Sequence, residues 1–261
     1  MIEWIIYLAI GVLAGTSAGL FGLGGGLIVV PALAAFYSAQ GMNPEIIMHV
    51  AVSTSLMTIV ITSLSSAYSH ARHGHINWRL LFILLPGVLI GSLLGAYFAV
   101  SVSTVFLQYA FVIYMLLAAV KVWLPNRFGQ SDILATKPML IGFGMIAGSV
   151  SALIGSGGGS LTVPYLVAAK QSIKHAIGTS AACGFPIAVA AVIGFLLFGE
   201  HLAGEQSGLI DWKAFGGIII TSIVFARVGA NLAKRLPVFI LQRIFSVLLL
   251  LVAAKMWLEI A

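Results

Sequence analysis

The stretch LFGLGGGLIVVP, from Leu20 to Pro31, decides how this chain folds. Four of the five residues from Gly22 to Gly26 are glycines, yet the stretch lies in a strongly apolar part of the chain. Each glycine in a helix interior lowers helix stability by about 0.8–1 kcal/mol relative to alanine. The glycines therefore predict a break in an apolar helix, and the break must serve something other than helix stability.

The composition of the chain is that of a membrane protein. Of its 261 residues, 61% are hydrophobic and 8% are charged, whereas about 25% of the residues of soluble domains are charged. Ten apolar segments follow one another along the chain, and several reach the roughly 20 residues that a bilayer-spanning helix needs. The sequence thus predicts an all-α polytopic membrane protein. The first segment lacks a basic flank and a small-residue cleavage site, so we expect no removable signal peptide.

The glycine-rich stretch occurs twice. GTSAGLFGLGGGLIVVP (Gly15–Pro31) aligns without gaps on GSVSALIGSGGGSLTVP (Gly148–Pro164). Further matches follow in the same order, with AVSTS opposite AIGTS, GHINW opposite GLIDW and KVWL opposite KMWL. Such an ordered series indicates duplication. The sequence predicts a first membrane repeat at 1–124, a cytoplasmic linker at 125–137 and a second membrane repeat at 138–261.

The two repeats are predicted to be inverted. Each holds five apolar segments, and a unit with an odd number of crossings enters the membrane in opposite directions when it is repeated in tandem. The loop Ala71–Arg79 is basic and its counterpart Gly199–Asp211 is acidic, as expected if they face the cytoplasm and the outside. With Arg72 inside, ten cationic residues lie on the cytoplasmic side, and Lys213 and Lys255 lie outside. Both termini are then predicted outside.

Glycine-rich breaks at corresponding positions of inverted repeats indicate a transporter binding site near the membrane midplane. The first two segments of each repeat form a glycine-broken hairpin, which either crosses the membrane or re-enters. Non-helical backbone at this depth is tolerated where it is buried or lines a watery cavity. The helix that restarts after each break offers unpaired N–H groups with partial positive charge. These features predict an anion site at Gly24, Gly25, Gly26, Ser156, Gly157, Gly158, Gly159 and Ser160, with Thr162 nearby.

Two features of the hairpins stay open in the sequence. The glycines could instead let helices pack closely, as small residues do in many membrane proteins. Their repetition in an inverted duplication favours the binding role. Pro31 and Pro164 either mark the first turn of the restarting helices or kink those helices.

Further candidate site residues lie in the later segments. The pairs Thr54-Ser55 and Thr179-Ser180 could supply hydroxyl donors to the site, although such side chains also bond their own helix backbone. Arg227 lies in an apolar segment. It either extends to the cytoplasmic surface or attracts anions into a vestibule.

The loop SHARHGHINW contains His70, His73 and His75 without an accompanying carboxylate or cysteine. Because adjacent Arg72 opposes a cation, we expect no metal there.

These motifs resemble the sulfite exporter TauE/SafE family of membrane transporters over essentially the whole chain. The resemblance rests on the two glycine-rich hairpins ending in proline, the A-[VI]-x-T-S runs beginning at Ala51 and Ala176, and the RLP stretch at Arg235–Pro237. It implies transport of sulfite, of sulfonates such as sulfoacetate, or of other small sulfur-containing anions.

The chain departs from the family pattern at two places. Val52-Ser53 stands where Ile177-Gly178 carries the more typical glycine, and Leu23 and Leu27 replace the hydroxyls of Ser156 and Ser160. Both departures predict that the second repeat forms the more polar side of the site.

The predicted function is secondary transport of a small, sulfur-containing anion by alternating access to a midplane site at the two hairpin tips. We expect no enzyme activity, cofactor, metal or nucleic acid. GLGGG also lacks the GK[ST] ending of a nucleotide-binding loop. The expected partners are the anionic substrate and membrane lipid in a bacterial plasma or inner membrane, and a homo-oligomer stays open. The alternatives are an intramembrane enzyme that uses the His70, His73 and His75 loop, and a non-transporting membrane assembly protein.

Overall fold

The structure is a computed structural model that describes residues 2–21, 25–123, 136–203, 208–233 and 238–260. Every regular element in these ranges is an α-helix. The first five are α1 (Ile2–Phe21), α2 (Gly26–Ala39), α3 (Ile47–Arg72), α4 (Trp78–Ser101) and α5 (Thr104–Trp123). The next are α6 (Lys137–Ile154), α7 (Gly159–Ala168), α8 (Ile173–Phe198), the short α9 (Glu200–Ala203), α10 (Trp212–Ala233) and α11 (Val238–Ile260).

The helices are those of a polytopic membrane protein. Within the described ranges, α1, α3, α4, α6, α8 and α10 are long and apolar enough to cross a bilayer. Large apolar side chains such as Leu117, Leu197 and Leu251 are exposed on the molecule, as suits a surface solvated by lipid. The predicted all-α polytopic membrane fold is confirmed.

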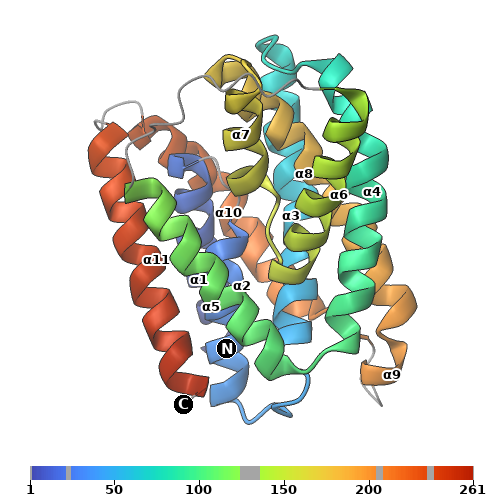
Figure 1. The fold of residues 1–261 in the computed structure, drawn as a ribbon. Coiled ribbons are helices and arrows are strands. Elements are labelled where there is room, and N and C mark those ends of the chain that lie inside the picture. The colour runs from blue at the N-terminus through green and yellow to red at the C-terminus, as the bar shows by residue number, and fades with distance from the viewer. Residues whose placement is uncertain (1, 22–24, 124–135, 204–207, 234–237, 261) are drawn as a thin grey trace.

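The glycine-rich breaks join two helical hairpins that enter from opposite ends. In Figure 1, α1 and α2 start and finish at the lower end, whereas α6 and α7 start and finish at the upper end. With 14 and 10 residues, α2 and α7 are too short for a full crossing. The two hairpins meet inside the molecule, because a Cβ added to Gly26 would overlap the carbonyl oxygen of Gly155.

The prolines lie inside the returning helices of the hairpins. Pro31 and Pro164 each stand at the sixth position of their helix, because α2 begins at Gly26 and α7 begins at Gly159. The interpretation that the prolines mark the first helical turn is therefore wrong.

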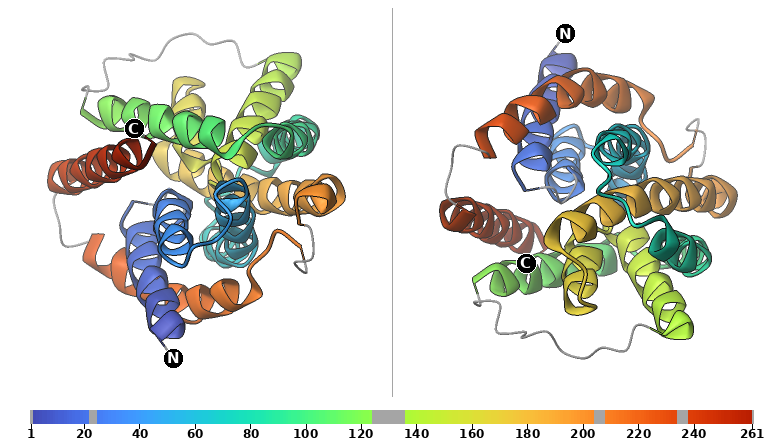
Figure 2. Two further views of the ribbon diagram at one scale, coloured as in Figure 1. Left: turned by 90° about the horizontal axis from the view of Figure 1, so that it is seen from below. Right: turned by 90° about the horizontal axis from the view of Figure 1, so that it is seen from above.

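Helices α1–α5, here named the first set, pack against helices α6–α11, here named the second set. Figure 2 shows α1 beside α10 on one side of the molecule and α4 beside α6 on another. Glycines permit both contacts. A Cβ on Gly15 would lie 2.5 Å from the Ser222 carbonyl oxygen in α10, and one on Gly148 would lie 2.5 Å from the Val88 carbonyl oxygen in α4. For these glycines the close-packing role is the correct one. The long helices α3 and α8 pack on each other at the centre.

Charged residues distinguish the two ends of the molecule. The end of α3 at Arg72, the start of α4 beside Arg79 and the start of α6 at Lys137 all lie at the top of Figure 1, here named the Arg72 end. The start of α10, beside Lys213, lies at the opposite end with α9, here named the α9 end. The outer ends of α1 and α11 also lie at the α9 end. Both chain termini therefore lie at one end, and the basic and acidic loops lie at opposite ends.

Candidate functional site

A cavity of about 770 Å³ lies between α1 and α10 on one side and α3 and α8 on the other. Its inner end is lined by Gly25, Gly157 and Gly159 from the two hairpins. Its outer end is lined by Arg72 and His73, so it opens at the Arg72 end. The glycine-rich breaks thus lie at the bottom of a large cavity, as the sequence predicts for a substrate site.

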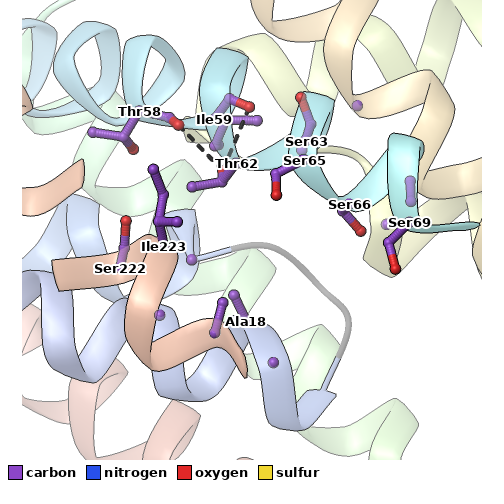
Figure 3. A pocket seen from close by; sticks show the side chains of 18 of the residues that line it. Ala18, Thr58, Ile59, Thr62, Ser63, Ser65, Ser66, Ser69, Ser222 and Ile223 are labelled. Atoms are coloured by element: carbon purple, nitrogen blue, oxygen red, sulfur yellow. Dashed lines mark hydrogen bonds between the residues drawn. The ribbon is translucent and has the colours of Figure 1, made fainter. Parts of the chain in front are cut away.

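Hydroxyl groups of α3 form one wall of the cavity (Figure 3). Thr58, Thr62, Ser66 and Ser69 follow at steps of four, four and three residues, which places them on one face of a helix. At 1.5 Å per residue, the wall from Thr58 to Arg72 extends for about 20 Å. Ser222 and Ile223 of α10 face this wall in Figure 3. The cavity therefore has one hydroxyl-lined wall, which extends from the Arg72 end toward the hairpin tips.

The charges that line the cavity are positive. Arg72 of α3 and Arg227 of α10 stand on opposite walls, and His70 and His73 lie near Arg72. None of the described lining residues is an Asp or Glu. Low-dielectric walls around charges of one sign concentrate the field and attract ions of the opposite sign. The cavity is thus electrostatically suited to an anion.

The tip of the second hairpin is shaped by two glycines with left-handed backbone. Gly155 has a φ of 68° and Gly158 a φ of 74°, a conformation that costs other residues about 1–2 kcal/mol. The Gly155 carbonyl accepts a hydrogen bond of 2.9 Å from the Ser55 hydroxyl. Gly158 is the N-cap of α7. The first N–H groups of α7 therefore have no carbonyl of the preceding helical turn to bond.

Hydroxyl groups from both parts of the chain surround this tip. The Thr162 hydroxyl bonds that of Ser180, and the Tyr114 hydroxyl bonds that of Ser160. Ser156 is 2% exposed, and its hydroxyl has no hydrogen-bond partner among the described residues. The hydroxyls around the second hairpin tip thus come from α7, α8 and the segment between α6 and α7, together with Tyr114 of α5 and Ser55 of α3.

The two threonines predicted to contact substrate, Thr54 and Thr179, accept hydrogen bonds at corresponding positions of α3 and α8. The Thr54 hydroxyl in α3 accepts a hydrogen bond of 2.9 Å from the N–H of Asp211, just before α10. The Thr179 hydroxyl in α8 accepts one of 2.9 Å from the N–H of Asn77, just before α4. The first bond holds the start of α10 against α3, and the second holds the start of α4 against α8. We call these two contacts the clasps.

The predicted site residues therefore divide into two groups and one outlier. Those that line the cavity are Gly25, Gly157, Gly159, Ser180 and Arg227. Those that the structure places behind its wall are Gly26, Thr54, Ser55, Ser156, Gly158, Ser160 and Thr179. Gly24 lies outside the described residues. Sequence reasoning missed the hydroxyl wall of α3, whose signal was polar residues at helical spacing within an apolar helix.

The histidine loop stands at the mouth of the cavity. The ring centroids of His70 and His73 lie 5.9 and 5.8 Å from that of His75. No group of His, Cys, Asp or Glu able to hold a metal ion occurs among the described residues. The loop therefore places imidazole side chains beside Arg72 at the mouth of the cavity.

Comparison with known proteins identifies the relatives of the chain. A probable membrane transporter protein of Haemophilus influenzae is 34% identical over 260 residues, which cover 98% of both chains. The probable membrane transporter protein YunE of Bacillus subtilis is 24% identical over 278 residues, which cover 97% of both. No solved structure matches the chain significantly. The family model described as sulfite exporter TauE/SafE matches residues 7–256, and the chain belongs to this family of membrane transporters.

Proposed function

We propose that the protein is a secondary transporter that carries a small anion, most simply a sulfur-containing one such as sulfite or a sulfonate, by alternating access. The observation that carries the proposal is the cavity, whose described charged lining residues are all cations and whose inner end is formed by the hairpin tips. The hydroxyls of α3 offer neutral hydrogen-bond donors along the route. Membership of the TauE/SafE family supports this class of substrate.

The orientation of the protein follows from the same charges. The cationic residues at the Arg72 end would face the cytoplasm by the positive-inside rule, and both termini would then face outside. Helix α1 packs on α10, and α6 packs on α4. In each pair the first helix of one predicted repeat contacts the fourth long segment of the other, which supports two inverted repeats at 1–124 and 138–261. In this orientation the cavity opens to the cytoplasm.

Anion-dependent thermal stabilisation of the purified protein tests the proposal. Sulfite, thiosulfate, sulfoacetate and taurine would be compared, since a ligand that binds only the folded state raises its stability. We expect Arg227→Leu to weaken the anion response several-fold at low ionic strength and Arg227→Lys to retain most of it, because an exposed charge acts mainly through a screened field. Arg79→Leu is the matched control, since Arg79 lies at the same end but outside the cavity.

A second variant in the same assay addresses the glycines. A Cβ on Gly157 would meet only Ile59 Cγ2, at 3.4 Å, and no positive φ opposes it. Gly157→Ala should therefore fold normally and lose the anion response, because its methyl group enters the inner end of the cavity. Gly158→Ala is a poorer test, since its φ of 74° and the approach of Ile187 Cδ1 at 2.6 Å would lower stability whatever its role. A normal anion response in both Arg227→Leu and Gly157→Ala would rule out this site.

A further inference from the structure

The hydroxyl face of α3 continues beyond the cavity. Thr54 stands one helical turn before Thr58 on the same face, at the inner end of the cavity. Its hydroxyl meets the N–H of Asp211, and Ser53 beside it donates to the Leu209 carbonyl. Polar groups on α3 thus extend from Ser69 near the Arg72 end to Thr54, about 10 Å from the start of the helix at the α9 end.

At Thr54 the polar face reaches a cluster that joins four helices. The carboxylate oxygen Oδ2 of Asp211 accepts hydrogen bonds of 2.9 Å from the Tyr7 hydroxyl of α1 and 3.0 Å from the Tyr37 hydroxyl of α2. Its other oxygen accepts the N–H groups of Lys213 and Ala214 at the start of α10. Through Thr54 the cluster is also bonded to α3.

Burial and charge make this cluster a barrier. Tyr7 and Tyr37 are 3% and 0% exposed, so their rings fill the space between the hairpin and α3. The Asp211 carboxylate is half-buried, and its negative charge would repel an anion. Four hydrogen bonds to the carboxylate hold it in one position.

Ser180, Ala181 and Gly184 of α8 line the inner part of the cavity, but the hydroxyl face of α3 has no counterpart farther along α8. The residues of α8 that correspond to Thr58, Thr62, Ser66 and Ser69 are Cys183, Ile187, Ala191 and Gly194. All four are buried, and a Cβ on Gly194 would lie 2.6 Å from Ala96 Cβ in α4. On α8, the positions that correspond to the hydroxyl wall of α3 are therefore packed inside the protein, although Ser180 beside the second clasp lines the cavity.

We infer that the translocation path runs along α3 alone, and that Asp211 with Tyr7 and Tyr37 is its closed gate toward the α9 end. This inference rests on the proposed transport function. In this arrangement α3 supplies the polar wall of the route, whereas α8 acts as scaffold. Opening toward the α9 end requires the two tyrosine hydroxyls to release Asp211.

Thiol labelling from each face tests the gate. The single native cysteine, Cys183, is removed as Cys183→Ala, and Gly74→Cys and His201→Cys mark the two faces in oriented vesicles. Thr58→Cys is the reporter at the inner end of the cavity. With the gate intact, a membrane-impermeant maleimide should modify it from the Arg72 end and not from the α9 end. In the double variant Tyr7→Phe, Tyr37→Phe, labelling from the α9 end should rise at least about tenfold, because two hydrogen bonds to a carboxylate are lost.

Matched controls keep the test decisive. Thr179→Val breaks the corresponding clasp and should leave the labelling of Thr58→Cys unchanged. Ala191→Cys should stay unlabelled from both faces, with and without sulfite, whereas Ser66→Cys should react from the Arg72 end. If the double variant does not fold, the single variants Tyr7→Phe and Tyr37→Phe replace it, each with one tyrosine bond left and a smaller expected rise.

Two results would overturn the inference. One is unchanged labelling from the α9 end in a folded tyrosine variant, and the other is labelling of Ala191→Cys from that end during transport. Labelling of the reporter needs no substrate, so the gate can be detected even if the cargo is not an anion. An absent anion response together with intact one-sided labelling would defeat only the proposed function.

Discussion

The helices α3 and α8 have the same length and the same Thr-Ser pair, yet they differ in the side chains that they present to the cavity. Both have 26 residues, and both use their threonine to hold the entry of a helix from the other set. Beyond that point α3 lines the cavity with hydroxyls and Arg72, whereas α8 lines it with Ser180, Ala181 and Gly184 and packs Cys183 and Ile187 in an apolar core. The comparison teaches that two helices with the same Thr-Ser pair and the same kind of contact can present different side chains to one cavity.

The largest expected effect comes from giving α8 a residue of the α3 wall. Ile187 is fully buried and packs beside Gly158. Ile187→Thr should lower the free energy of unfolding by roughly 2–4 kcal/mol, from lost apolar packing together with an unpaired buried hydroxyl. Thermal melting in detergent measures the loss. A variant as stable as the parent would mean that α8 borders water, and the contrast with α3 would fail.

A smaller effect is expected at the clasps, where the two helices should behave alike. Thr54→Val and Thr179→Val each leave a buried N–H without its acceptor, at a cost of about 1–3 kcal/mol. Serine in place of either threonine should restore most of the lost stability, because it keeps the hydroxyl. A loss in only one of the two valine variants would show that the clasps are not equivalent.

The smallest effect on stability is expected on the α3 wall itself. Thr62 is half-buried at the cavity, and its hydroxyl bonds only the backbone of its own helix in this structure. Thr62→Val should change stability by less than about 0.5 kcal/mol. It should weaken sulfite-dependent stabilisation about tenfold, as expected for one lost hydrogen bond to a charged group. If Thr62→Val and the parent protein respond equally to sulfite, then Thr62 does not contact the anion, and other hydroxyls of the wall, such as Ser66, would have to do so.

Sequence reasoning succeeded where the determinant is local or repeated. The glycine clusters predict both hairpin breaks, and left-handed φ angles occur at Gly155 and Gly158. It did not reveal the tertiary partners of Thr54 and Thr179, whose predicted contact with substrate stays a prediction. Their hydroxyls are used by the N–H groups of Asp211 and Asn77. Those partners lie more than 100 residues away in the chain, and no local pattern reveals such a pairing.

The sequence by itself determined the membrane class, the positions of the breaks and the separation of charge between the two ends, because hydrophobicity, glycine content and charge act through local physics and lipid solvation. The inverted duplication stays a prediction. Only the tertiary structure decided which glycines border the cavity and which let helices touch. A Cβ on Gly157 would meet only Ile59 Cγ2, at 3.4 Å, whereas Gly15 lies against the backbone of α10. The same residue type serves both purposes, and its role depends on the atoms that a distant segment brings beside it.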